Sequence, residues 1–184
     1  MSEYKTIFLN DRELKYILSS SYNTKKIALK INQDGVLKVS KPIFVSQRII
    51  EKFILQKQVW VLKKIDFFKN DCHQMKAGDY KKDKLRARNL VLSRLNYFSR
   101  FYDFKVNKIF VRNQKTRWGS CSSQGNLNFN YRILYLPSYL VDYVIAHEIC
   151  HLFEMNHSAD FWKLVEKQIP DYKNRRKELK KFVF

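Results

Sequence analysis

The spacing of hydrophobic residues divides the chain into a β-rich beginning and a mainly helical remainder. Hydrophobic and polar residues alternate over residues 4–18 and again over residues 25–40, and each stretch contains a central turn dipeptide, Asn-Asp or Asp-Gly. These patterns predict two β-hairpins. From residue 46 to residue 68 the hydrophobic residues recur at helical spacing, which predicts helical structure after the hairpins.

Beyond a polar loop predicted at residues 70–78, the pattern indicates further helices and strands. Helices are expected at residues 79–102, 138–153 and 158–169 and from Pro170 to the end, and strands at residues 106–112, 117–122 and 126–131. The last two strands form a predicted hairpin around Gln124-Gly125 that leads towards the helix capped by Ser138. Gly119, in the first of these strands, removes a side chain where another backbone can approach closely.

Three polar residues interrupt the hydrophobic face of the helix predicted at residues 138–153. His147 and His151 are four residues apart, so they project from one side of a helix and can hold one metal ion between them. Glu148 is rotated by ~100° from His147, which places it beside a metal-bound water rather than on the metal. This is the His-Glu-x-x-His pattern, in which two imidazoles bind zinc and the glutamate is the general base.

A third histidine, His157, follows the predicted helix end, and a chain that turns back there brings it to the same ion. Three protein ligands and one open position are typical of a catalytic zinc site. A structural zinc with Cys150 as fourth ligand is the alternative. However, Cys150 is rotated about the helix axis by ~80° from the direction midway between His147 and His151. We therefore predict a catalytic site for one zinc ion.

Length and composition set the broad class. The 184 residues fit one domain, with a hairpin-and-helix part at residues 1–70 and a catalytic part at residues 79–184. No hydrophobic run approaches the ~20 residues of a membrane span, and the first residues lack the layout of a signal peptide. The three cysteines are odd in number and scattered, which favours reduced thiols and a cytoplasmic location.

The chain is strongly basic. It carries 36 Lys and Arg residues against 17 Asp and Glu residues, a formal charge of +19. Such an excess favours polyanionic partners such as nucleic acids or phosphorylated substrates, although the lysines are spread over every segment. We expect weak, sequence-independent nucleic-acid binding at most, and no membrane partner.

Residues 147–162, together with residues 117–122 and 126–137, resemble the YgjP-like metallopeptidase domain, a family related to the Wss1-like and SprT-like zinc peptidases. The resemblance implies an α+β, zincin-like fold, in which a twisted antiparallel sheet packs on the metal-bearing helix. It also implies that His147, His151 and His157 bind the zinc and that Glu148 is the base. The histidine spacing equals that of metzincins, but Glu154 stands where those proteins have glycine.

The leading functional prediction is a zinc-dependent hydrolase of the metallopeptidase class, in which Glu148 activates a zinc-bound water. Two alternatives stay open: a nucleotide pyrophosphatase that cleaves phosphoanhydrides, and a nucleic-acid-associated protease that acts on DNA-bound proteins. Either substrate, peptide or nucleotide, needs an oxyanion stabiliser. Arg117, Tyr131 and Arg132 are the candidates, and Trp118 is expected to line the cleft beside a strand that pairs with extended substrate.

Overall fold

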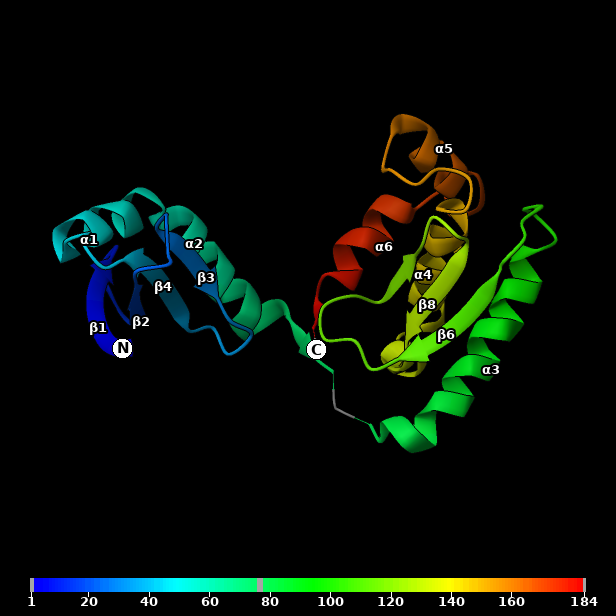
Figure 1. Ribbon diagram of the computed structural model, residues 1–184, viewed down its shortest axis with the longest axis horizontal. Helices are drawn as coiled ribbons and strands as arrows, with labels where there is room; N and C mark the ends of the chain where they lie inside the picture. Colours follow the sequence, from blue (N-terminus) through cyan, green and yellow to red (C-terminus); the bar gives the residue numbers. More distant parts are fainter. Residues whose placement is uncertain (1, 76–77, 184) are drawn as a thin grey trace. The chain divides into compact units, whose positions relative to one another are not determined.

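The computed structural model describes residues 2–75 and 78–183, which fall into two compact units (Figure 1). Unit 1 is Met1–His73 and unit 2 is Gln74–Phe184. Each unit buries its own cluster of hydrophobic side chains. Strands and helices are mixed in both, which confirms the predicted α+β class. The single domain over residues 1–184 stays a prediction.

Unit 1 is built on a four-stranded sheet. Its strands are β1 (Ser2–Leu9), β2 (Arg12–Ser21), β3 (Ala28–Ile31) and β4 (Leu37–Pro42), in the order β1-β2-β4-β3. The β1–β2 and β3–β4 pairs are antiparallel, which confirms both hairpins, and β2 runs parallel to β4 in the centre. The first turn holds Asn10 and Asp11 at φ 47° and 61°, the left-handed region that these residue types tolerate.

Two helices, α1 (Gln47–Gln56) and α2 (Gln58–Asp66), cover one side of this sheet (Figure 1). Their buried residues Ile50, Ile54, Val61 and Ile65 join the buried strand residues in a single cluster. Ser46 occupies the N-cap position of α1, although its side chain makes no capping hydrogen bond.

The prediction of a polar loop at residues 70–78 is wrong for its first residues. A π-helix continues α2 over Phe67–Asp71, and a two-residue strand, β5, follows at His73–Gln74. In unit 2, the N–H of Met75 donates to the carbonyl oxygen of Val183 at 2.9 Å, so this segment is tied by backbone hydrogen bonding. Residues 76 and 77 lie outside the described residues.

Unit 2 places a small sheet against helices (Figure 1). Its elements are α3 (Tyr80–Phe98), β6 (Lys108–Arg112), β7 (Gly119–Cys121), β8 (Asn126–Asn130), a 3₁₀ turn (Tyr131–Tyr135), α4 (Ser138–Cys150), α5 (Ala159–Gln168), α6 (Tyr172–Leu179) and β9 (Phe182–Val183). The side chain of Asp79 caps α3 by accepting from the N–H groups of Lys81 and Lys82. The last helix ends at Leu179 and not at the chain end, a correction to the prediction.

The sheet of unit 2 is mixed and not purely antiparallel. Strands β7 and β8 form the predicted antiparallel hairpin, but β8 lies in the centre and pairs with β6 in parallel. The hairpin carries β8 back beside β6, and the segment between β6 and β7 makes the crossover. This register puts Gly119 opposite Phe129, with β7 on the sheet edge next to α4.

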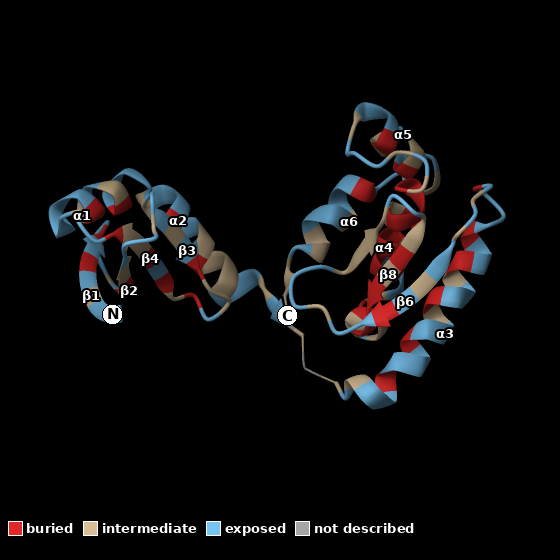
Figure 2. Cartoon of the chain, in the orientation of Figure 1, coloured by how far each residue is buried: buried red, intermediate tan, exposed pale blue. Residues whose placement is uncertain are grey.

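Helix α4 is the centre of unit 2 and is buried along most of its length (Figure 2). Pro137 occupies its N-cap position and Ser138 is the first helical residue, so the predicted Ser138 cap is wrong. Asp142 binds Arg94 of α3 through an ion pair of 2.6 Å, which joins the two helices. Within the described residues, no helix is long and apolar enough to cross a membrane.

Candidate metal centre and active site

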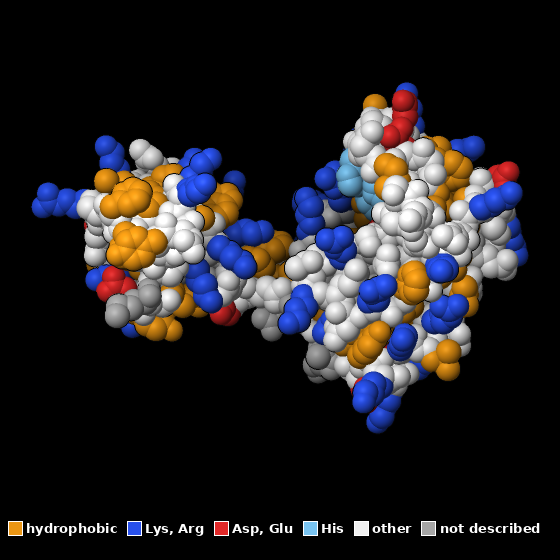
Figure 3. Space-filling view, in the orientation of Figure 1, with side chains coloured by type: hydrophobic (Ala, Val, Ile, Leu, Met, Phe, Trp, Pro, Cys, Tyr) orange, Lys and Arg blue, Asp and Glu red, His pale blue; other side chains and the backbone are white. Residues whose placement is uncertain are grey.

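The end of α4 brings the three predicted histidine ligands together. His147 lies on the last turn of α4, His151 is the C-cap residue, and His157 lies on the connection to α5. The Nε2 atoms of His147 and His157 are 3.2 Å apart, and one ligand atom from each histidine lies within 4.8 Å of the other two. Histidine side chains reach the surface here beside a group of basic side chains (Figure 3).

This geometry fits a zinc ion. Two nitrogens at 2.0–2.1 Å from a tetrahedral zinc are roughly 3.3 Å apart, close to the observed separation of His147 and His157. Burial, followed by the neighbouring His151 and His157, lowers the pKa of His147 to about 3, and burial also lowers the pKa of His157. Both rings are therefore neutral at physiological pH, the form that binds a metal.

The orientation of His151 is set by the backbone. Its Nδ1 lies 3.0 Å from the carbonyl oxygen of Glu154, and because a carbonyl only accepts, Nδ1 carries the proton. In the neutral ring this tautomer leaves Nε2 available to a metal, the arrangement usual for metal-binding histidines. His151 is only 9% exposed, so its ring has little freedom to turn away.

Two aromatic residues of helix α5 pack against the three histidine rings. Phe161 is fully buried, and its ring centroid lies 4.9, 4.5 and 4.8 Å from those of His147, His151 and His157. Trp162 stacks on His157 at 5.6 Å, with an interplanar angle of 20°. Ser158 caps the start of α5, where its side-chain oxygen accepts a hydrogen bond from the N–H of Phe161. This packing therefore holds the three imidazoles in position without a metal ion.

Glu148 is buried against Gly119 of β7. It is 5% exposed, and its Oε2 atom has no hydrogen-bond partner among the described residues. Burial raises the pKa of Glu148 to about 8, against a smaller lowering by the positive charge of Arg117. A buried oxygen without a partner is costly, which is expected where a water or reacting group is to be bound.

Gly119 makes room for Glu148. A Cβ atom added at Gly119 would lie 2.5 Å from Oε1, 2.6 Å from Cγ and 2.7 Å from Cδ of Glu148, all closer than van der Waals separation. The sequence predicted a close approach by a backbone at this glycine, but the approaching group is the catalytic candidate's side chain.

A pocket of about 210 Å³ opens in front of this pair. Its walls are Trp118 and Gly119 from the β7 side, Tyr143, Val144, His147 and Glu148 from α4, and Leu179 from α6. Tyr143 is 4% exposed, and burial raises the pKa of its hydroxyl to about 12. The hydroxyl therefore stays protonated and is a hydrogen-bond donor next to His147 and Glu148.

Arg176 of α6 adds positive charge to the same region. Its guanidinium lies 4.8 Å from the ring centre of Trp162, the ring that stacks on His157. Its charge acts on three groups of the site, lowering the pKa values of His147 and His157 and opposing the larger effect of burial on Tyr143. Arg176 and Tyr143 were not among the residues singled out from the sequence.

Cys150 takes no part in the histidine group. It is fully buried and its Sγ contacts the hydroxyl of Tyr102 at 3.8 Å, and burial raises the pKa of the thiol to about 11. A protonated thiol held on the core side of α4 is a packing residue.

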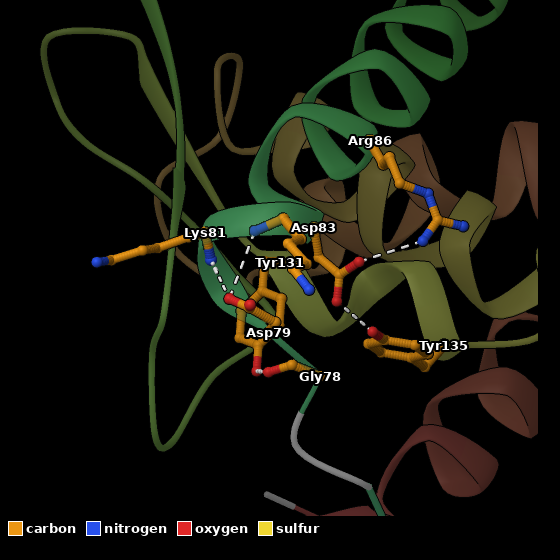
Figure 4. Close-up of polar contacts among 8 residues, drawn as sticks. Gly78, Asp79, Lys81, Asp83, Arg86, Tyr131 and Tyr135 are labelled. Atoms are coloured by element: carbon orange, nitrogen blue, oxygen red, sulfur yellow. Dashed lines mark hydrogen bonds and ion pairs between the residues drawn. The ribbon is translucent and has the colours of Figure 1, made fainter.

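The four substrate candidates from the hairpin have different positions. Trp118 lines the pocket, and Arg117 is exposed and close enough to influence the pKa of Glu148. Tyr131 is buried in the core, where its hydroxyl donates to the carbonyl oxygen of Gly78 at 2.9 Å (Figure 4). Arg132 donates to Oδ1 of Asn113 at 2.8 Å and lies over the ring of Tyr131. Neither of these two residues is among those lining the pocket.

Tyr143 could have been found from the sequence, because it lies one helical turn before His147 and so shares its face. Arg176 and Leu179 carried no such signal. They lie about 30 residues further along the chain and reach the site only through the packing of α6 against α4.

Three imidazole nitrogens beside a buried glutamate, at the end of a helix that packs against a sheet edge, could hold a metal ion in the arrangement used by metal-dependent hydrolases. The family model for the YgjP-like metallopeptidase domain matches residues 80–182, more than half of the chain. The chain therefore belongs to this metallopeptidase family, which confirms the resemblance seen in the sequence.

Among solved structures, the chain is similar to the crystal structure of the metallopeptidase zymogen abylysin from Pyrococcus abyssi. The identity is 22% and the TM-score 0.43, over 51% of this chain and 99% of that chain. None of the curated proteins compared with the chain matches it.

Proposed function

We propose that the protein is a zinc-dependent peptidase in which Glu148 is the general base. The observation that carries the proposal is the meeting of three imidazoles at the end of α4, where His147 lines the same pocket as Glu148 and Oε2 of Glu148 has no hydrogen-bond partner among the described residues. His147, His151 and His157 would hold one zinc ion. When bound, zinc supplies Lewis acidity, which polarises a carbonyl group and makes a water molecule acidic near neutral pH.

Glu148 moves the proton in this scheme. Burial keeps its carboxyl group neutral at pH 7 in the metal-free protein, since its pKa is about 8. A divalent cation within a few ångströms favours the ionised form, so the carboxylate becomes a base when the site is filled. Oε2 can then accept a proton from the attacking water and pass it to the leaving amine, which balances the hydrolysis.

Tyr143 is the proposed oxyanion stabiliser, in place of the hairpin residues expected from the sequence. Tyr143 lines the pocket beside His147 and Glu148, its hydroxyl stays protonated, and a tyrosine donor is a known type of oxyanion partner. The exposed guanidinium of Arg176 adds positive charge nearby and suits a carboxylate or oxyanion of the substrate. Trp118 and Leu179 provide the hydrophobic walls for a substrate side chain.

The test uses zinc-loaded wild-type protein and Glu148→Gln, incubated in parallel with peptides, denatured proteins, DNA-bound proteins and nucleoside triphosphates. Glu148→Gln should keep its zinc and its thermal stability but lose hydrolysis by ~10²-fold or more. Equal turnover by both proteins contradicts the proposal. Cleavage of nucleoside triphosphates alone replaces the peptidase by a phosphoanhydride hydrolase.

A second pair of variants tests Tyr143. Tyr143→Phe should lower kcat by ~10²-fold with little change in KM or zinc content, because only the hydrogen bond to the oxyanion is removed. Tyr139→Phe is the matched control, one turn earlier on α4, where the hydroxyl donates to Glu178 instead of facing the pocket. An unchanged kcat in Tyr143→Phe removes this residue from the mechanism and leaves the role of Glu148 intact.

A further inference from the structure

The sheet of unit 1 has one face without a helix against it. Side chains on a strand point alternately to the two faces of a sheet, and Ile7, Leu9, Tyr16, Leu18, Leu37 and Val39 are buried with residues of α1 and α2. The residues between them point to the opposite side. On β1 these include two aromatic rings, Tyr4 at 76% exposure and Phe8 at 65%. Large exposed rings on a regular strand are unusual where nothing covers them.

The strand register places lysines beside these rings. Tyr4 lies opposite Ile17, Ile17 opposite Lys38, and Lys38 opposite Lys30, which gives one row across all four strands. With strands ~4.8 Å apart, Lys38 is ~10 Å from Tyr4 along this row. Lys15 belongs to the same exposed face, opposite Thr6. Glu13, opposite Phe8, is the acidic residue on this face. We call this surface the aromatic-basic face: Tyr4, Phe8, Glu13, Lys15, Ile17, Lys30 and Lys38.

The pairing of Lys30 with Lys38 is the most informative feature of this face. Like charges directly opposite each other on neighbouring strands destabilise a sheet. Among the described residues, no ion pair within 4 Å relieves either lysine. A bound anion between the two ammonium groups would remove the repulsion. Unit 1 as a whole has 14 basic and 7 acidic residues, a formal charge of 14 − 7 = +7.

We propose that the aromatic-basic face binds single-stranded nucleic acid. Exposed rings provide stacking surfaces for unpaired bases, and lysines beside them bind the phosphates, the combination used by sequence-tolerant single-strand binding sheets. Tyr4 and Phe8 are four residues apart on one strand, ~13 Å, so each ring can take a different base. Duplex DNA has no unstacked bases and would gain nothing from the rings, which is why the occupant is single-stranded.

The experiment measures binding of the full-length protein to labelled ~12-nucleotide DNA and RNA single strands and to a duplex, by fluorescence anisotropy. The wild type should prefer either single strand to the duplex. Tyr4→Ala/Phe8→Ala should weaken single-strand binding by ~10-fold for each stacking ring removed. Phe44→Ala is the matched control, since this ring is 84% exposed but lies on the segment between β4 and α1.

Two charge variants complete the test. Lys30→Glu/Lys38→Glu should weaken binding. It should also make the decrease of log affinity with log salt less steep, by ~0.7 for each phosphate that is no longer neutralised. Lys52→Glu/Lys57→Glu makes the same change in net charge on the helical side of unit 1 and should have a small effect. Thermal unfolding of every variant confirms that the fold is kept.

Three outcomes overturn the proposal. They are duplex binding as tight as single-strand binding, wild-type affinity in Tyr4→Ala/Phe8→Ala, and equal effects of the two lysine pairs. Each would show that the affinity comes from net charge alone. The result is independent of hydrolysis, because none of these residues lies in unit 2.

Discussion

Replacement of Gly119 by alanine tests the packing between β7 and the candidate base. The backbone of Gly119 does not have a positive φ, so alanine is not excluded by conformation, and the effect comes from the added Cβ alone. That atom would lie 2.5 Å from Oε1 of Glu148, whereas carbon atoms at a favourable separation are ~3.5–4.0 Å apart. The carboxyl group therefore has to move by ~1 Å, or β7 has to move away from α4.

Two magnitudes follow from this shift. Overpacking of this kind costs ~1–3 kcal/mol of unfolding free energy. A ~1 Å displacement of a catalytic group can lower the rate by ~10²-fold. Zinc content should stay near the wild-type level, because the clash does not involve the histidines. Urea unfolding, zinc analysis and turnover of whichever substrate is found measure the three quantities.

A double-mutant cycle with Glu148→Ala gives the decisive control. Without the carboxyl side chain the added methyl group has room, so Gly119→Ala should cost little in this background and can even stabilise the strand by ~0.5 kcal/mol. The coupling free energy between the two changes should be ~1–3 kcal/mol. Additivity within ~0.5 kcal/mol, together with wild-type turnover in Gly119→Ala, would refute the assigned packing.

Three further outcomes are expected. His157→Ala should weaken zinc binding by ~10²-fold or more, because the two remaining ligands come from one helix. Competition with a chromophoric chelator measures the affinity, and full zinc retention excludes His157 as a ligand. Phe161→Ala should lower the free energy of unfolding in urea by ~3–5 kcal/mol and also weaken zinc binding, whereas Phe161→Leu should keep most of the stability and of the zinc affinity. Equal zinc affinity in the wild type and the two variants means that the ring does not position the histidines. In metal-free protein the pKa of Glu148 is about 8, above its ordinary value of 4.5, so its carboxyl group keeps a proton that the unfolded chain releases, and its contribution to stability should fall as pH rises between these values. The lowered pKa of His147 acts in the opposite direction up to pH 6.5, so the net fall in stability is expected between pH 6.5 and 8. Glu148→Gln should remove the contribution of this residue, which is at most ~5 kcal/mol. If the free energies of unfolding of the wild type and of Glu148→Gln change with pH in the same way over this range, the prediction is contradicted.

Local physical signals were sufficient for much of the fold. Asn10, Asp11 and Gly35 carry the positive φ values of the two hairpin turns in unit 1, as their residue types indicated. Asp79 and Ser158 cap their helices through their own side chains. Such features involve neighbours within a few residues, so the sequence alone determines them. Ser138 failed as a cap because Pro137, one residue earlier, takes the N-cap position with φ −52° and ψ 142°.

The candidate site divides in the same way. The spacing of His147, His151 and His157 is a property of one continuous segment, and the sequence therefore determined which three side chains could meet. The position of Glu148 one residue after His147 likewise determined that it points away from the ligand row. What surrounds these four residues depends on segments far away along the chain.

Only the tertiary structure decided those surroundings. The parallel pairing of β6 with β8 puts β7 on the sheet edge, and that register places Gly119 against Glu148. The packing of α5 and α6 brings Phe161 behind the imidazoles and Arg176 beside them. The same packing turned Tyr131, a predicted substrate residue, into a core residue. Arrangements of this kind are set by how whole elements bury their apolar faces against one another, and no short-range pattern in the sequence encodes that choice.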